Sequence, residues 1–138
     1  MSVKEPSVSF SIPFKPVPQK RPRVYRRGSF TVAVDPSKKD KEDFLALASE
    51  FKPESPMEGA LKFEVEFMMP IPKSKRKTKA GDPHISRPDI DNLTKLVMDA
   101  LQGTFYKEDS NISNLTSKKF YSNETGVRVN VSKIEVKS

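Results

Sequence analysis

The segment from Leu61 to Met69 constrains the fold of this chain more than any other part of its sequence. Apolar residues occupy every second position, and the charged residues Lys62, Glu64 and Glu66 stand between them. The apolar positions are Leu61, Phe63, Val65, Phe67 and Met69. A period of two is typical of a strand that buries one face. We therefore expect a sheet in which this strand is central or near-central, with an apolar layer packed against it.

The stretch from Asp89 to Leu101 predicts a helix that supplies such a layer. Its apolar residues recur at the spacing of one helical face, and Gly103 follows as a natural stop. These residues are Ile90, Leu93, Leu96, Val97, Ala100 and Leu101. A second helix is expected after residues 35–37, with Asp35 or Ser37 at its cap and Pro53 beyond its end.

The remaining periodic segments predict further strands. Alternation over residues 8–14 indicates one strand, and a basic turn at residues 26–29 between two apolar runs indicates a hairpin. Residues 115–121 and 126–136 are expected to form a final antiparallel pair joined by a short turn. With two main helices, this pattern predicts one small α+β domain over residues 1–138 with a mixed or antiparallel sheet.

Composition excludes several classes of site. The 138 residues include no Cys and one His, which rules out disulfides, thiolate nucleophiles and His-rich metal cages. The apolar runs are far shorter than the ~20 residues of a membrane-spanning helix, and no signal region opens the chain. We expect a soluble cytoplasmic protein without a membrane partner.

The charge balance points to a polyanionic partner. There are 25 Lys and Arg residues against 18 Asp and Glu residues, giving a net charge of +7. Cations concentrate in two expected loops, at about residues 15–29 and 70–88. The candidate DNA-binding residues are Lys20, Arg21, Arg23, Arg26, Arg27, Lys73, Lys75, Arg76, Lys77 and Arg87. The alternative is a solvated basic surface, but two runs that flank one candidate site favour DNA.

Two aromatic residues, Tyr25 and Phe30, stand beside the first basic run. They could stack on exposed bases. We instead expect them to form the apolar core of the hairpin.

A stripe of charge runs along the helix predicted from Asp89. Asp91, Lys95 and Asp99 are spaced four apart and face away from the apolar residues. Asp89 precedes them, and Glu108 and Asp109 would join them if the turn after the helix folds back. Acids at a helix start are also ordinary, because the helix dipole favours them, and the stripe could be a surface ladder. Crowded carboxylates without Cys or His ligands nevertheless suit Mg²⁺ or Mn²⁺.

These residues carry a resemblance to a known family. Residues 88–95 read Pro-Asp-Ile-Asp-Asn-Leu-Thr-Lys, followed by Asp-Ala-Leu at 99–101 and Glu-Asp-Ser-Asn-Ile at 108–112. Together with Lys-Pro at 15–16 and Lys-Arg-Pro-Arg at 20–23, this pattern resembles the RusA family of Holliday junction resolvases. The similarity extends from about Ser9 to Val136.

The resemblance implies a small α+β homodimer that binds four-way DNA junctions and cuts opposing strands with Mg²⁺ or Mn²⁺. It implies that the metal ligands are Asp89, Asp91 and Asp109 and that Lys95 is an essential catalytic lysine. Asp99 also matches a recurring acid, and Glu108 is a possible second ligand or neighbour. His84 is expected in an exposed loop, where it could touch DNA.

Three functions remain to be compared. The first is a metal-dependent endodeoxyribonuclease that resolves Holliday junctions by paired symmetric nicks in DNA recombination and repair. The second is a noncatalytic nucleic-acid-binding module whose acids are structural. The third, nucleotide hydrolysis, is disfavoured because no Gly-rich phosphate loop is present.

Overall fold

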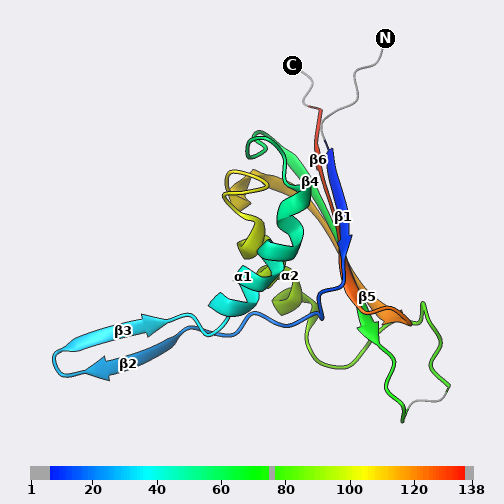
Figure 1. The fold of residues 1–138 in the computed structure, drawn as a ribbon, viewed down its shortest axis with the longest axis horizontal. Helices are drawn as coiled ribbons and strands as arrows, with labels where there is room; N and C mark the ends of the chain where they lie inside the picture. Colours follow the sequence, from blue (N-terminus) through cyan, green and yellow to red (C-terminus); the bar gives the residue numbers. More distant parts are fainter. Residues whose placement is uncertain (1–6, 75–76, 136–138) are drawn as a thin grey trace.

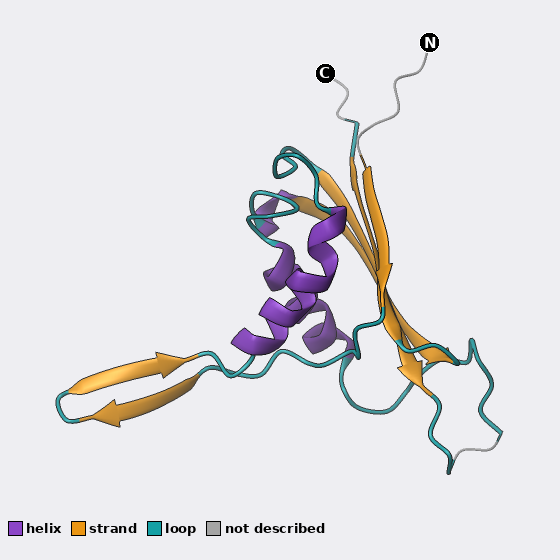
Figure 2. Cartoon of the chain, viewed as in Figure 1, coloured by secondary structure: helices purple, strands orange, loops and turns teal. Residues whose placement is uncertain are grey.

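The protein forms an α+β domain in which two helices cover one face of a four-stranded sheet (Figures 1 and 2). The computed structural model describes residues 7–74 and 77–135. The elements in chain order are β1 (Ser7–Ile12), β2 (Arg23–Arg27), β3 (Phe30–Val34), α1 (Lys38–Ala48), the 3₁₀ turn η1 (Ser49–Phe51), β4 (Leu61–Pro70), α2 (Ile90–Leu101), the 3₁₀ turn η2 (Asp109–Asn111), β5 (Ile112–Ser122) and β6 (Gly126–Lys133). The expected fold class is confirmed.

The sheet is mixed, with strand order β1-β6-β4-β5. The β4 strand lies inside it, as expected, between antiparallel β6 and parallel β5. Because β4 and β5 are parallel, the chain must cross over between them, and α2 is the helix that makes this crossover. The candidate functional residues on α2 are thereby brought against the edge strand β5.

The core lies between the sheet and the two helices. The β4 residues that alternate in the sequence, such as Phe63 and Val65, are at most 1% exposed. Phe44 of α1 is fully buried and contacts Phe10 and Phe14, with ring centroids 6.3 and 5.1 Å apart. This packing holds α1 on the sheet and beside α2.

The expected antiparallel pairing of the last two strands is wrong. The β5 and β6 strands run in opposite directions, but β4 separates them and pairs with both. Val127, Val129 and Val131 of β6 lie opposite the buried aromatic and aliphatic residues of β4. Long-range burial therefore overrides the short connection between the two strands.

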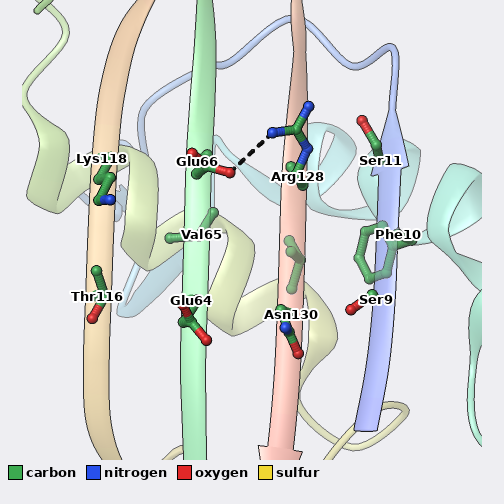
Figure 3. Close-up of a pocket in the computed structure, with 11 residues that line it drawn as sticks. Ser9, Phe10, Ser11, Glu64, Val65, Glu66, Thr116, Lys118, Arg128 and Asn130 are labelled. Atoms are coloured by element: carbon green, nitrogen blue, oxygen red, sulfur yellow. Dashed lines mark hydrogen bonds and ion pairs between the residues drawn. The ribbon is translucent and has the colours of Figure 1, made fainter.

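The other face of the sheet is polar and hollowed. Figure 3 shows Glu64 and Glu66 of β4 on this face beside Arg128 and Asn130 of β6. Arg128 and Glu66 form an ion pair with a nitrogen–oxygen distance of 3.1 Å. Among the residues that the structure describes, no helix is long and apolar enough to cross a membrane.

Candidate active site between α2 and β5

The α2 helix begins at the motif identified in the sequence. Asp89 occupies the N-cap position with extended backbone, and its side chain makes no capping hydrogen bond. Leu93, Leu96 and Val97 are buried, while Asp91 and Lys95 on the other side are exposed. Burial of the apolar face thus leaves the charged stripe available to solvent.

The turn after α2 folds back, as the candidate site requires. Gly103 has a φ of +89°, a left-handed conformation that suits glycine, and its N–H donates to the Tyr106 carbonyl at 2.7 Å. The backbone N–H of Asp109 donates to Gln102 Oε1 at 2.9 Å. Asp109 is thereby held against the last turns of α2.

Tyr106 orients the Asp109 carboxylate from inside the core. It is fully buried, and its hydroxyl lies 2.8 Å from Asp109 Oδ1 and also contacts the Met98 carbonyl. Burial, followed by the hydrogen bond and charge of Asp109, raises the pKa of Tyr106, so the hydroxyl keeps its proton and remains a donor. Tyr106 is a positioning residue that the sequence did not single out, because it reads as one more core aromatic.

The electrostatics of Asp109 depend on Asp99. Burial raises the pKa of Asp109; the hydrogen bond from Tyr106 opposes this, and the charge of Asp99 and a hydrogen bond with it raise the pKa further. Asp99, whose role the sequence left open, is therefore a direct neighbour of Asp109. Two adjacent carboxylates repel each other unless a proton or a cation lies between them.

These side chains share one pocket between α2 and β5 with a volume of about 410 Å³. Its lining residues are Ile90, Asp91, Thr94, Lys95, Met98, Asp99, Asp109, Leu115 and Ser117. Thr94 Oγ1 and Ser117 Oγ are 2.6 Å apart and join the helix to the strand. The pocket therefore combines three carboxylates and one ammonium group with walls held by both elements.

Lys95 does not act as a simple partner for the acids of its stripe. Within the described part of the chain, no ion pair at 4.0 Å or less includes Lys95. The surface-ladder interpretation of Asp91, Lys95 and Asp99 needs such pairs. Their absence leaves the Lys95 ammonium available to an anionic ligand.

Asp89 lies apart from the other predicted metal ligands. It lines a neighbouring pocket of about 700 Å³ with Lys15, Arg87 and Asn92. Residues 7–74 and 77–135 contain no group of three His, Cys, Asp or Glu side chains that is close enough to hold a metal ion. The carboxylates of Asp91, Asp99 and Asp109 fit a hard divalent cation in chemistry, but the structure does not bring Asp89, Asp91 and Asp109 into one cluster.

The candidate DNA-binding residues lie on exposed segments, and Arg87 lines the pocket of Asp89. Lys20, Arg21, Arg23, Arg26 and Arg27 of the first basic run are exposed, as are Lys73, Lys77 and Arg87 of the second. Lys75 and Arg76 lie outside the described residues. Lys119 of β5, which the sequence did not single out, donates to the Pro88 carbonyl at 2.8 Å and ties the second loop to the sheet.

Two expectations about side-chain exposure are wrong. His84 is 9% exposed rather than in an open loop, and its ring lies 4.8 Å from that of Tyr121. Tyr25 and Phe30 do not form a hairpin core, because they are 46% and 72% exposed. The loop containing His84 folds onto β5, whereas the hairpin projects away from the body (Figure 1).

Comparison with known proteins shows the family to which this chain is similar. The family model of endodeoxyribonuclease RusA matches residues 13–132. Uncharacterized protein YqaN of Bacillus subtilis (strain 168) is 36% identical over an alignment of 137 positions, and the alignment covers 92% of this chain and 96% of that protein. The matched range contains both pockets and the hairpin.

Proposed function

Because this chain belongs to the RusA endodeoxyribonuclease family, we propose that it resolves four-way DNA junctions with the help of a divalent metal ion. The observation that carries the proposal is the return of Asp109 to the charged stripe of α2, where it shares a pocket with Asp91, Lys95 and Asp99. The neighbouring pocket, which Asp89 lines, also holds Lys15 and Arg87, two cations that suit a DNA backbone.

The residues that would hold Mg²⁺, or Mn²⁺ in its place, are Asp91 and Asp109, with Asp89 as the third ligand. When bound, the ion supplies Lewis-acid chemistry that offsets negative charge on a phosphodiester. Asp89 would reach this position by a rotation of its exposed side chain or a shift of the first turn of α2 when DNA binds.

The other side chains of the pocket would orient the reacting groups. Lys95 presents its ammonium group toward the phosphate and stabilises charge that develops there. Tyr106 holds Asp109 through its hydroxyl, and Asp99 keeps a second carboxylate beside Asp109. The position of Asp109 is thus set by the buried Tyr106, whereas Lys95 is exposed to solvent.

We further propose that the active form is a homodimer. A four-way junction presents two strands of like polarity related by a two-fold axis, and a symmetric dimer presents two sites with the same relation. Such a dimer cuts both strands within one binding event, as recombination and repair of DNA require. A supercoiled plasmid with an extruded cruciform would then be converted directly to linear product, without accumulation of the singly nicked form.

The nuclease proposal is tested with a four-way junction labelled on one strand at a time. Denaturing gels should show cuts at symmetric positions in two opposing strands with Mg²⁺ and none with EDTA, while linear duplex is cut far more slowly. Asp91→Asn should bind the junction and make no nicks.

The matched control is Asp43→Asn, which removes a similar carboxylate from the exposed face of α1. It should cut at the parental rate. If Asp91→Asn also cuts at that rate, the metal-site assignment is wrong. Salt-dependent binding with no Mg²⁺-dependent cutting by the parental protein would instead identify a noncatalytic binding module.

A further inference from the structure

The β2–β3 hairpin is an arm that contributes nothing to the core of the domain. All its residues are exposed, and none belongs to the buried core cluster. Figure 1 shows it projecting from the body beyond the start of α1. A two-stranded hairpin is marginally stable in water by itself, so a long exposed arm with apolar side chains calls for a binding partner.

One face of the arm alternates aromatic or aliphatic side chains with cations. Side chains of directly opposed residues in an antiparallel pair share a face. Tyr25 is opposite Val32, and Arg27 is opposite Phe30. The other face carries Val24, which pairs with Ala33, and it has no aromatic residue. The two faces therefore differ in chemistry, and only the first offers flat apolar surfaces between positive charges.

The base of the arm is fixed beside the candidate active site. The Gln19 N–H donates to the Asn92 carbonyl of α2 at 2.9 Å, and the Lys20 N–H donates to Ser37 Oγ at 2.8 Å. Ser37 is fully buried at the start of α1, although the sequence suggested its hydroxyl as a helix cap. Both strands of the arm thus leave the body next to the pocket that Asp89 lines.

Charge selects a nucleic acid over a second copy of this chain as the occupant. Residues 7–34 carry six Lys and Arg residues and no Asp or Glu. DNA phosphates would release counterions on contact with the arm's arginines, whereas a second copy of this chain, with a net charge of +7, offers no comparable excess of negative charge.

The exposure of Tyr25 and Phe30 then indicates which part of the DNA the arm contacts. Bases inside a linear duplex are stacked on one another and offer no free face to Tyr25 or Phe30. The branch point of a four-way junction is where stacking is interrupted and base faces become available. Stacking of a base on an aromatic side chain changes affinity by about 5- to 150-fold per base.

We propose that the Tyr25 and Phe30 face of the arm stacks on bases at the branch point of junction DNA and distinguishes junctions from linear duplex. The inference rests on the proposed function for the identity of the substrate. It assigns recognition of branched structure to the arm and leaves cutting to the pocket beside α2.

The proposal is tested by binding in EDTA, where cleavage does not contribute. The double variant Tyr25→Ala/Phe30→Ala should lose at least about 10-fold in affinity for a four-way junction and less than about 3-fold for linear duplex. Val24→Ala, which truncates an exposed side chain on the opposite face, should change neither affinity. Unchanged thermal melting would show that the variants are folded.

A positional readout comes from photocrosslinking with 5-iodouracil. Placed at the branch point, it should crosslink to the arm, as mapped by mass spectrometry of the peptides; placed in the middle of a junction arm, it should not. Equal loss of junction and duplex affinity in the double variant would overturn the proposal in favour of groove binding. If the double variant without DNA sediments differently from the parental protein, the proposal is overturned in favour of contact between two chains.

Failure of this inference is separable from failure of the proposed function. If the parental protein crosslinks through the arm but never cuts in Mg²⁺, the nuclease assignment fails and the arm inference stands. If the parental protein cuts junctions and the double variant keeps full selectivity, the arm inference alone fails.

Discussion

The pocket beside α2 and the β2–β3 arm hold their functional side chains in opposite ways. In the pocket, Asp109 is oriented by the fully buried Tyr106 and by Gln102. On the arm, Arg27 and Phe30 are exposed and have only each other's strand for support. Chemistry at a phosphodiester needs groups held within a fraction of an ångström, whereas capture of a polyanion needs charge that reaches into solvent. Under the two proposals above, these regions separate catalysis from capture within one small domain.

The largest expected effect separates two adjacent acids. Asp109→Asn should reduce junction cleavage in Mg²⁺ by at least about 1,000-fold, because it removes a proposed metal ligand. Glu108→Gln should cost less than about 3-fold, since Glu108 does not line the pocket and its carboxylate accepts from Ser110 Oγ. Single-turnover cleavage rates measure both. Equal losses would make Glu108 a second ligand.

The next effect compares the core with the arm in stability. Phe44→Ala should lower the free energy of unfolding by about 3 kcal/mol, because Phe44 is fully buried against Phe10 and Phe14. Phe30→Ala should change it by less than about 0.5 kcal/mol, because Phe30 is 72% exposed. Urea denaturation of both variants provides the measurement. A large loss in Phe30→Ala would show that the arm packs on something in solution.

A smaller effect is expected when one hydroxyl is removed from each region. Tyr106→Phe should lower the cleavage rate or metal affinity by about 10- to 100-fold, because Asp109 loses its orienting donor. Tyr25→Phe keeps an aromatic face on the arm and should leave both unchanged.

Tyr106→Phe should also shift the pH dependence of the cleavage rate. The hydrogen bond from Tyr106 lowers the pKa of Asp109, so its loss in Tyr106→Phe should raise that pKa. Because Asp109 must be ionised to bind a cation, the acid limb of the rate profile should move to higher pH. A profile of Tyr106→Phe that coincides with the parental one would remove Tyr106 from the site.

The smallest effect concerns salt. The slope of log affinity against log salt concentration should become less negative by about 1 to 2 in Arg26→Ala/Arg27→Ala, as expected for two lost phosphate contacts. Lys107→Ala/Lys133→Ala also removes two cations, from a separate pocket near residues 53–58, and should leave the slope unchanged. Binding titrations from 50 to 200 mM salt compare the two. Equal slopes would show that net charge, not the arm, drives capture.

Local periodicity made much of the fold predictable. The alternation over β4 and the apolar face of α2 are properties of consecutive residues, and both elements form where they were expected. Strand partners were harder, because β5 and β6 are joined by a short turn typical of a hairpin, yet each pairs with β4. Their separation depends on burial against a strand about fifty residues earlier in the chain, which no local pattern encodes.

The same division applies to individual side chains. Asp91, Lys95 and Asp109 could be singled out because their spacing and chemistry form a motif. The orienting role of Tyr106 could not, since it depends on the turn at Gly103. The burial of His84 depends likewise on a loop that folds onto β5, where the backbone N–H of His84 donates to the backbone carbonyl of Lys119.

The sequence by itself determined that this chain forms a sheet covered by an amphipathic helix, with acids at the helix start and cations in the flanking segments. Periodicity and residue chemistry carry that information, because they act between neighbours along the chain. Only the tertiary structure decided that Asp109 meets Asp99, that Asp89 faces a different pocket, and that Tyr25 and Phe30 are exposed. These outcomes depend on which distant segments pack together, and the burial of the core sets that packing.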